Sequence, residues 1–439
     1  MIKKLLTLPI VFAFVTTAFS QTFRVSQMDS LFRILDENQK FMGSVVLVQN
    51  GKVFYRNAIG FTDVETGRRS NTETLFRIGS VSKMFTAALV LKAVEEKRLS
   101  LQDKLDLYFP EIFNSKKIII RDLLNHRSGI HNFTSEETYL KYYTFSKSQQ
   151  EMLKVLSNLK SDFEPGLRPQ YSNSNYVILS YILEKVYGKP YADILKNKVT
   201  RPLHLSSTRA GGKIALKNNE AYSFAFDNKW IKDQETDLSI PMGAGSVVSN
   251  PTDLAMFISD LFKARIISKK SLEEMKTMVN GFGMGMFESN FDGNTAYGHT
   301  GSIDKFQSTL WYFPKIDLSV AIISNGLRYQ LENVFKAVIS IYFQKPFKMP
   351  SFREVTVHAD DLKPLTGTYS SKVMPLKIVV TQVDNQLFAQ ATGQSAIALK
   401  ANGDDSFEFE EAGIILQFNR QNSGMILKQG GKEIPFSKD

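Results

Sequence analysis

A serine followed three residues later by a lysine, Ser80 and Lys83, is the pair in this sequence best suited to covalent chemistry. Residues at positions i and i+3 share one face of an α-helix, about one turn apart. If a helix begins near Val81, the hydroxyl and the amine meet at its N-terminus. There, unpaired backbone N–H groups and the helix dipole stabilise developing negative charge. The spacing therefore predicts a nucleophilic serine with a basic partner.

The residues after this pair support the same interpretation. The stretch from Met84 to Val94 is apolar on nearly every side, which indicates a buried central helix, expected to end near Leu99. A buried amine loses hydration, and this lowers its pKa and makes it a usable base. The same spacing occurs in two other pairs, Ser157 with Lys160 and Ser302 with Lys305. Neither begins a long apolar helix, so Ser80 is the predicted nucleophile.

Tyr171 and Asn173 follow a Pro165-Gly166 turn and form a second candidate group. A tyrosine oxygen beside a cationic lysine can hold or relay a proton, and an asparagine amide can bind a substrate amide. The alternative is structural: Ser172 or Asn173 would cap the helix that follows.

A third group, His299 and Thr300, lies between Gly298 and Gly301 and shortly before a predicted strand. Glycine at a strand edge allows a ligand backbone to approach closely. Taken alone, His299 fits a structural role better than a catalytic one.

The elements that would position these residues change character along the chain. Residues 26–41 have helical periodicity, and residues 43–61 read as a hairpin around Asn50-Gly51, a strong turn signal. From Leu99 to about Gly281 the pattern is mostly helical. Strands return at residues 308–313 and 318–323, before a last helix over residues 331–343.

This order predicts an α+β fold in which one antiparallel sheet, built from both ends of the domain, is flanked by helices beside an all-helical half. Ligands favour the crevice between two such halves.

Residues 345–358 read as a linker, and short alternating strands follow it over residues 376–380, 386–391, 407–409 and 414–418. This pattern predicts a small antiparallel β-barrel over residues 359–439. It contains no catalytic pattern, so we expect it to stabilise or cover the catalytic domain.

Residues 1–20 have the features of a signal peptide: Lys3 and Lys4, the apolar run 5–14, and small residues at Ala18 and Ser20. We expect cleavage after Ser20, a catalytic domain over residues 21–344, a periplasmic or secreted location and no stable membrane span afterwards. A retained N-terminal anchor is the alternative.

Composition excludes several classes of function. The chain has no cysteine, which excludes disulfides, a thiol nucleophile and a lipid-modified cysteine. Its five histidines form no cluster with carboxylates, so we expect no metal and no other cofactor. The net charge of +10 is scattered rather than concentrated in a basic run, and nucleic-acid binding is not expected.

In combination, Ser80-x-x-Lys83, Tyr171-x-Asn173 and His299-Thr300-Gly301 resemble the three signatures of the serine beta-lactamase and penicillin-binding protein superfamily. The tyrosine in the second motif resembles the class C branch, which includes DD-peptidases, D-aminopeptidases and esterases. The resemblance covers about residues 26–343. Further similar stretches are 123–129, 164–166, 243–246 and 252–254. The C-terminal part resembles the lipocalin-like accessory barrels of some members.

The resemblance implies a role for each residue. Ser80 would form an acyl-enzyme, while Lys83 and Tyr171 would share general-base and general-acid work, with the choice of base left open. Asn173 would contact the substrate amide. The N–H groups of Ser80 and Ser302 would form an oxyanion hole, and His299, Thr300 and Gly301 would line the strand edge.

Two departures bear on the substrate. His299 stands where beta-lactamases of this kind have lysine, which favours a DD-peptidase or D-aminopeptidase over a beta-lactamase. Residues 302–305 replace glycines with bulk and charge. We therefore expect an exported serine hydrolase that acts on a small amide or ester, with a D-amino-acid-containing peptide as the favoured substrate. The alternatives are a carboxylesterase on the same scaffold and a non-hydrolytic binder of cell-wall fragments or beta-lactams.

Overall fold

The computed structural model describes residues 8–352, 357–403, 405–409, 412–429 and 432–439, with backbone only for residues 8–22. The chain divides into two compact units, Phe41–Leu327 and the pair of segments Met1–Lys40 and Arg328–Asp439. The large unit has a core formed from residues between Val46 and Ile323, and the β-barrel in the other unit has a core of its own.

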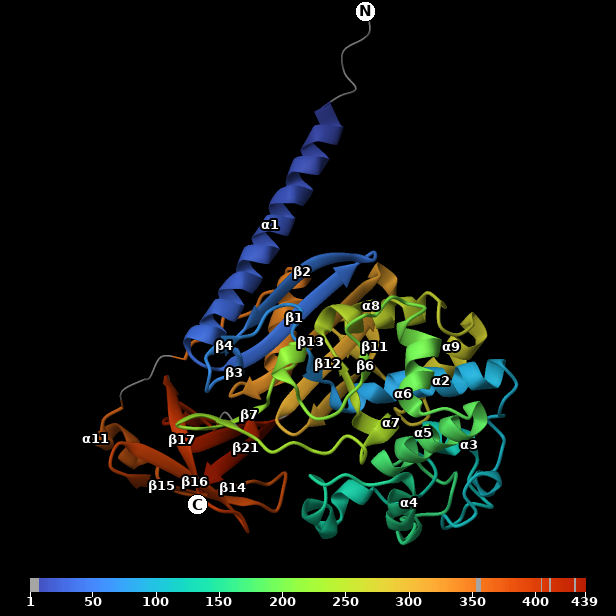
Figure 1. Ribbon diagram of the computed structural model, residues 1–439. Coiled ribbons are helices and arrows are strands. Elements are labelled where there is room, and N and C mark those ends of the chain that lie inside the picture. The colour runs from blue at the N-terminus through green and yellow to red at the C-terminus, as the bar shows by residue number, and fades with distance from the viewer. Residues whose placement is uncertain (1–7, 353–356, 404, 410–411, 430–431) are drawn as a thin grey trace, which may run out of the picture. The chain divides into compact units, whose positions relative to one another are not determined.

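One antiparallel sheet organises the unit Phe41–Leu327 (Figure 1). Its main path runs β10-β11-β12-β13-β1-β2. The strands are β1 (Phe41–Gln49), β2 (Lys52–Ile59), β10 (Phe287–Phe291), β11 (Asn294–Ile303), β12 (Phe306–Phe313) and β13 (Leu318–Leu327). Because β1 pairs with β13, the first and last strands of the unit are neighbours, which confirms the predicted sheet built from both ends.

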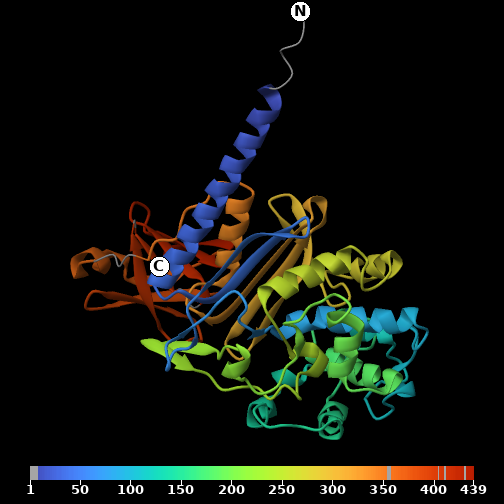
Figure 2. The same cartoon turned by 45° about the horizontal axis from the view of Figure 1, so that its top comes forward.

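The hairpin of β1 and β2 follows from its turn residues. Asn50 and Gly51 both have positive φ, at 51° and 73°, as a two-residue turn between twisted strands requires. Almost all of β1 is buried, and α8 (Pro251–Phe262) packs across β1, β12 and β13, as the olive helix beside the sheet shows in Figure 2.

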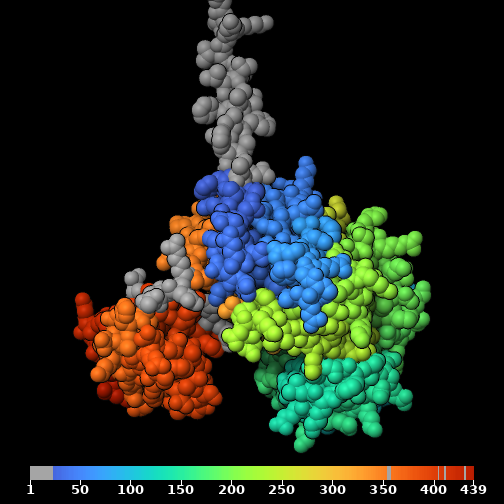
Figure 3. All heavy atoms as spheres, turned by 60° about the vertical axis from the view of Figure 1, so that its left-hand side comes forward, coloured from blue at the N-terminus to red at the C-terminus, as the bar shows by residue number. Residues whose placement is uncertain are grey.

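Helix α2 (Ser82–Glu95) contacts α5, α6 and α7, and the chain from about residue 120 to 220, teal to green, forms one continuous part of the surface in Figure 3. The remaining helices of this unit are α3 (Ile120–Leu124), α4 (Gln149–Ser157), α5 (Asn173–Tyr187), α6 (Tyr191–Leu195), α7 (Met242–Gly245) and α9 (Lys269–Lys276). Helix α2 contacts α5 and α7 and is buried along most of its length, as predicted. It ends at Glu95 and not near Leu99, because Lys97 takes a left-handed conformation with a φ of 57°.

The region from Leu99 to Gly281 is less helical than predicted. It contains four short strands, β6 (Arg209–Ala210), β7 (Phe224–Asp227), β8 (Lys229–Lys232) and β9 (Val247–Ser249). Strand β9 pairs with β6 and with β5 (Phe76–Arg77), and β7 pairs with β8 and in parallel with β13. Strands of two to four residues carry too little periodicity to be recognised, and distant pairing partners define them.

Shorter elements complete this unit: β3 (Phe61–Asp63), β4 (Arg68–Arg69), the π-helix η5 (Lys196–Thr200), and the 3₁₀ helices η1 (Gly79–Val81), η2 (Leu105–Leu107), η3 (Phe133–Ser135), η4 (Glu137–Lys141), η6 (Leu216–Asn218) and η7 (Pro314–Ile316).

The second unit contains α1 (Leu8–Glu37) and α10 (Leu331–Tyr342), which contact each other. The last predicted helix is confirmed. The prediction of a helix over residues 26–41 is wrong at both ends: α1 starts earlier and stops at Glu37, where Gln39 with a φ of 52° breaks it, and Phe41 already belongs to β1. Residues 1–7 of the predicted signal peptide lie outside the described residues. Within the described residues, no helix is both long and apolar enough to cross a membrane.

The C-terminal strands close into an eight-stranded antiparallel barrel, red in Figure 1, which confirms the predicted β-barrel. They are β14 (Gly367–Ser370), β15 (Lys377–Val383), β16 (Gln386–Ala391), β17 (Ile397–Gly403), β18 (Ser406–Phe409), β19 (Ile414–Asn419), β20 (Gly424–Gln429) and β21 (Lys432–Lys438), preceded by α11 (Ala359–Leu362) and η8 (Lys363–Leu365). Inward residues alternate, as Ile378 and Val380 do on β15. Residues 353–356 of the predicted linker lie outside the described residues, and the domain boundaries and lipocalin likeness stay predictions.

Candidate active site

Ser80 lies in the 3₁₀ turn η1, directly before α2, so its hydroxyl is at the N-terminus of this helix, as predicted. The side chain is half-buried. Gly79 has a φ of +50°, and a Cβ at this position would lie 2.8 Å from the backbone of Ser302. Because glycine has no side chain, the backbone of the turn that carries Ser80 can lie directly against the backbone of strand β11.

Lys83 extends its amine to Ser80, with Nζ 3.0 Å from Oγ. The side chain has no exposed surface, and this burial lowers the pKa of Lys83 well below its usual value. The predicted desolvated lysine is therefore present. A neutral amine is the form that can accept a proton from the serine hydroxyl.

The other contacts of Lys83 orient its lone pair. Nζ also lies 2.8 Å from Asn173 Oδ1 and 2.8 Å from the carbonyl oxygen of Ala244. Both of these oxygens accept hydrogen bonds, so a neutral Lys83 amine donates its two N–H groups to them. The remaining lone pair then faces Ser80 Oγ, which is the geometry of a general base.

Tyr171 contacts the same serine, and its hydroxyl donates to Ser80 Oγ at 2.8 Å. Burial raises the pKa of Tyr171 above its usual value, which keeps the phenol protonated. Its ring stacks on His126 with centroids 4.6 Å apart. A protonated Tyr171 supplies a hydrogen bond to the serine oxygen and leaves the accepting role to Lys83.

Asn173 begins α5 and bridges two parts of the site. Its Oδ1 accepts from Lys83, and its Nδ2 donates to Thr134 Oγ1 at 3.1 Å. The structural alternative was a side-chain cap at the start of α5. Ser172 occupies the N-cap position, but its side chain makes no capping hydrogen bond. Asn173 therefore connects Lys83 to Thr134, and its predicted contact with a substrate amide stays a prediction.

The third predicted group lies on β11. His299 is 3% exposed, and burial lowers the pKa of His299 to about 3. Its ring lies 6.2 Å from the ring of Tyr171, so the structure brings it to the same site in a neutral form. Thr300 and Ser302 are exposed beside it.

Gly301 lets β11 lie against the serine turn. A Cβ at this position would fall 2.2 Å from the carbonyl oxygen of Ile78 and 3.0 Å from the backbone nitrogen of Ser80. The backbone of Gly301 and Ser302 thus runs next to that of residues 78–80. The backbone nitrogens of Ser80 and Ser302 therefore lie on two segments in direct contact, as an oxyanion hole formed by these two groups would require.

The two other serine–lysine pairs are not built in this way. Ser157 ends α4 and its hydroxyl donates to the carbonyl of Lys154 at 3.2 Å, while Ser302 lies on a strand and Lys305 in the turn after it. Only Ser80, among these three serines, precedes a buried helix.

Two functional contacts were not predicted from the sequence. The carbonyl of Ala244 binds Lys83, and no side-chain pattern signals a backbone acceptor. His126 supports Tyr171: its Nδ1 accepts from the Ser172 N–H at 3.1 Å, and burial lowers the pKa of His126 well below its usual value. The family-like stretch 123–129 pointed to this loop but not to the stacking contact.

No group of histidine, aspartate and glutamate side chains in the described residues is arranged to hold a metal ion. His131 is engaged otherwise, since its Nδ1 lies 2.7 Å from Asp162 and its Nε2 3.2 Å from Glu136.

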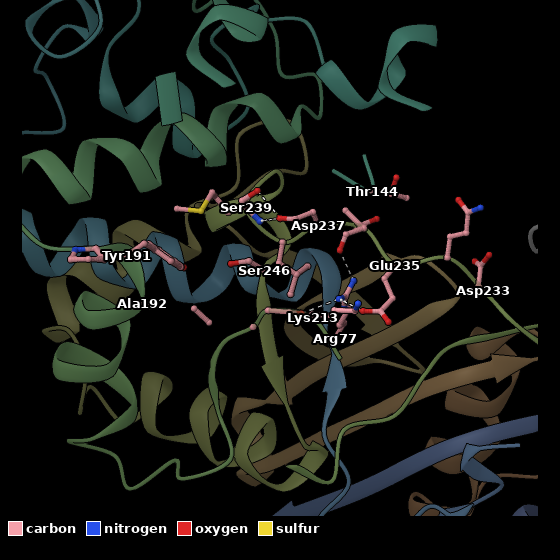
Figure 4. A pocket seen from close by; sticks show the side chains of 18 of the residues that line it. Arg77, Thr144, Tyr191, Ala192, Lys213, Asp233, Glu235, Asp237, Ser239 and Ser246 are labelled. Carbon is pink, nitrogen blue, oxygen red and sulfur yellow. Dashed lines mark hydrogen bonds and ion pairs between the residues drawn. The ribbon is translucent and has the colours of Figure 1, made fainter. Parts of the chain in front are cut away.

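A cavity of about 930 Å³ lies beside α7 (Figure 4). Met242 and Ser246, at either side of Ala244, line it, together with Arg77, Tyr191 and residues 232–239. Ser80, Lys83 and Tyr171 are not among the described residues that line it, so the cavity is distinct from the space around the serine.

The sheet with its helical half and the serine, lysine and tyrosine at their junction define a serine hydrolase of the beta-lactamase fold. The profile of the family described as Beta-lactamase matches residues 28–337, and the chain belongs to this family.

Two curated proteins illustrate what this chain is similar to in sequence. The chain is 28% identical over 235 residues to a teichoic acid D-alanine hydrolase of Staphylococcus aureus, covering 53% of this chain and 57% of that relative, little more than half its length. It is 25% identical over 442 residues to a penicillin-binding protein of Bacillus subtilis (strain 168), and the match covers 92% of this chain and 97% of that relative.

Among solved structures, a D-amino acid amidase from Ochrobactrum anthropi SV3 in complex with D-phenylalanine matches with a TM-score of 0.65 at 23% identity, covering 73% of this chain and 99% of that one. An octameric penicillin-binding protein homologue from Pyrococcus abyssi matches with a TM-score of 0.68 at 22% identity, and the match covers 94% of this chain and 100% of that one. At these identities the likeness is one of fold.

Proposed function

We propose that this protein is an exported serine hydrolase that cleaves an amide or ester of a D-amino acid through an acyl-enzyme on Ser80. The observation that carries the proposal is the position of Ser80 Oγ, 3.0 Å from the Lys83 amine and 2.8 Å from the Tyr171 hydroxyl. The names of the relatives, a D-alanine hydrolase and a D-amino acid amidase, support the D-amino acid.

In the acylation step, neutral Lys83 accepts the Ser80 proton as Oγ attacks the substrate carbonyl carbon. The carbonyl oxygen takes up negative charge beside the N–H groups of Ser80 and Ser302, where one such donor contributes about 3 kcal/mol. Collapse of this intermediate breaks the bond to the leaving group. The Tyr171 hydroxyl gives its proton to that group and is reprotonated with the proton held by Lys83. Water then attacks the ester by the same proton route in reverse.

The state of His299 bears on the substrate. With a pKa of about 3, its imidazole is neutral at physiological pH and offers the strand edge no positive charge. A substrate whose free carboxylate lies next to the scissile bond is bound less strongly by a neutral histidine at this strand edge than by a charged lysine. Of the two substrate classes expected from the sequence, the proposal therefore favours D-aminoacyl amides and esters over DD-peptidase substrates, which end in a carboxylate at the leaving group.

The same observation favours a carboxylesterase as the second candidate, because a neutral edge also accepts an uncharged alcohol leaving group. The two are separated by turnover of D-alanine amide, a D-alanyl ester, a short-chain nitrophenyl ester and a D-alanyl-D-alanine peptide. A chromogenic cephalosporin completes the panel.

We expect turnover of the D-aminoacyl compounds, its loss in Ser80→Ala, and unchanged turnover in Ser157→Ala, the matched serine with the same spacing to a lysine. Hydrolysis of nitrophenyl esters alone would favour the esterase. A stable adduct without turnover would instead indicate the non-hydrolytic binder.

The proposed export is tested separately by the mass of the mature chain. Cleavage after Ser20 leaves Gln21 as the first residue. A mature protein that retains residues 1–20 would favour the N-terminal anchor.

A further inference from the structure

A buried ion pair links the two backbone segments that carry the proposed oxyanion donors. Arg77 ends β5, three residues before Ser80, and Asp304 follows the end of β11, two residues after Ser302. Arg77 NH1 lies 2.9 Å from Asp304 Oδ2, and the two side chains are only 2% and 1% exposed. Asp304 therefore points into the protein, and its charge does not line the strand edge as residues 302–305 had suggested.

Each charge of the pair is held by further hydrogen bonds. Arg77 donates to the carbonyl of Thr236 at 2.7 Å and to the carbonyl of Gly212 at 3.0 Å, and contacts Glu235 at 3.2 Å, as the dashed lines from Arg77 in Figure 4 indicate. Asp304 Oδ1 accepts from the backbone N–H and the hydroxyl of Thr236, at 2.9 and 2.7 Å. These contacts fix the orientation of both side chains.

The same two segments touch through their backbones. Gly79 lies against Ser302, and Gly301 lies against Ile78. A side chain adds one more connection, because the Ser308 hydroxyl on β12 donates to the carbonyl of Ile78 at 2.8 Å. The distance between the Ser80 and Ser302 N–H groups thus depends on how firmly the turn after β11 is fastened to the end of β5.

We propose that Arg77 and Asp304 are positioning residues that hold the Ser80 and Ser302 N–H groups at the separation an oxyanion requires. This inference rests on the proposed function. Stability alone is a weak reason for the pair, because the cost of dehydrating two charges offsets much of their attraction and apolar replacements are often as stable. A catalytic constellation, in contrast, must be held within about 0.5 Å of its productive geometry.

The test compares Asp304→Asn and Arg77→Lys with the wild type. Asparagine keeps the size of Asp304 and its contact with Thr236 but removes the charge, and lysine keeps the charge of Arg77 with fewer hydrogen bonds. Asp260→Asn is the matched control, since Asp260 is 6% exposed on its side chain, lies 2.7 Å from Arg265 and is near the end of α8.

Two readouts are needed. Amide hydrogen exchange of the peptides containing residues 77–84 and 299–307 reports the connection without any substrate. Acylation by p-nitrophenyl cinnamate, followed by rapid mixing and by infrared spectroscopy of the cinnamoyl carbonyl, reports the oxyanion donors, because weaker hydrogen bonds raise the carbonyl stretching frequency.

We expect Asp304→Asn to speed exchange in both peptides together, to raise the carbonyl frequency and to slow acylation by about 10²–10³-fold, the loss typical of one oxyanion donor. Arg77→Lys should lie between Asp304→Asn and the wild type. Asp260→Asn should lower the melting temperature without changing the carbonyl frequency.

The proposal would be overturned if Asp304→Asn and Arg77→Lys had the same hydrogen-exchange rates, carbonyl frequency and acylation rate as the wild type. It would also be overturned if the two peptides exchanged faster while the carbonyl frequency stayed unchanged. The proposed function is judged separately, by turnover of the D-aminoacyl compounds: a wild-type chain that neither turns these over nor takes up a cinnamoyl group contradicts the proposed function and with it the oxyanion role. The exchange experiment then decides by itself whether the ion pair fastens the two segments.

Discussion

The protonation state of Lys83 determines which group receives the Ser80 proton. From the sequence, Lys83 and Tyr171 are both candidates for the general base. In the structure, burial lowers the pKa of Lys83 and raises that of Tyr171, so both groups are driven to their neutral forms. A neutral lysine accepts a proton, whereas a neutral phenol donates one. These directions favour Lys83 as the base.

Replacing Tyr171 by phenylalanine tests this assignment. With a p-nitrophenyl ester, whose leaving group needs no proton, Tyr171→Phe should slow single-turnover acylation by only about tenfold, the value of one hydrogen bond to Oγ. Lys83→Met should slow it by about 10²–10⁴-fold, the loss of a general base. If both substitutions cause equally large losses in stopped-flow acylation, Lys83 does not act alone as the base.

The buried His299 predicts how stability depends on pH. Its folded-state pKa of about 3 lies below the ordinary value near 6.5, so between these values the unfolded chain binds more protons. The free energy of unfolding should therefore fall as the pH is lowered from about 6.5 toward 3. His299→Asn should make this dependence shallower in urea titrations at a series of pH values. An unchanged slope would mean that His299 does not stay neutral in the folded protein.

At the scale of elements, the site depends on strand β11 lying directly against the turn before α2. Ser80 and Lys83 could be predicted from sequence because one helix start sets their geometry. Tyr171 and His299 come from distant parts of the chain, and only the resemblance to a family connected them. The Ala244 carbonyl has no side-chain signature at all.

The same distinction applies to the fold. The hairpin of β1 and β2, helix α10 and strands β12 and β13 carry strong local patterns, and their predictions are confirmed. Strand β11 was not predicted as a strand, because polar residues and two glycines, Gly298 and Gly301, interrupt its alternation. Its pairing with β12 defines it instead, and local patterns do not contain such long-range information.

A methyl group at Gly301 tests the contact between β11 and the serine turn. Its Cβ would fall 2.2 Å from the Ile78 carbonyl oxygen, so Gly301→Ala should force the two segments apart, cost about 1–3 kcal/mol of stability and sharply reduce acylation. Gly212→Ala is the control, because a Cβ there has no atom within 4 Å. Normal acylation in Gly301→Ala, measured beside its thermal unfolding, would contradict the described contact.

At the scale of the whole molecule, the chain contains two separate hydrophobic cores. One is formed between Val46 and Ile323, and the other between Leu362 and Phe436. Because no residue is shared between these cores, the barrel is expected to contribute its own unfolding transition.

A chain that ends at Phe343 tests this separation. It should stay soluble and keep a cooperative transition for the catalytic unit, while calorimetry of the full chain should show one more transition. Changed stability or substrate preference in the shortened chain would support the predicted stabilising or covering role of the barrel. Failure of the shortened chain to fold would contradict the independence of the two cores.

The central claim is that Ser80 is the nucleophile, and covalent labelling with a fluorophosphonate tests it most directly. Intact-mass spectrometry should find one adduct on the wild-type chain, peptide mapping should locate it on Ser80, and folded Ser80→Ala should take up none, while Ser157→Ala is labelled like the wild type. Labelling that persists in Ser80→Ala, or that maps to another serine, would contradict the account.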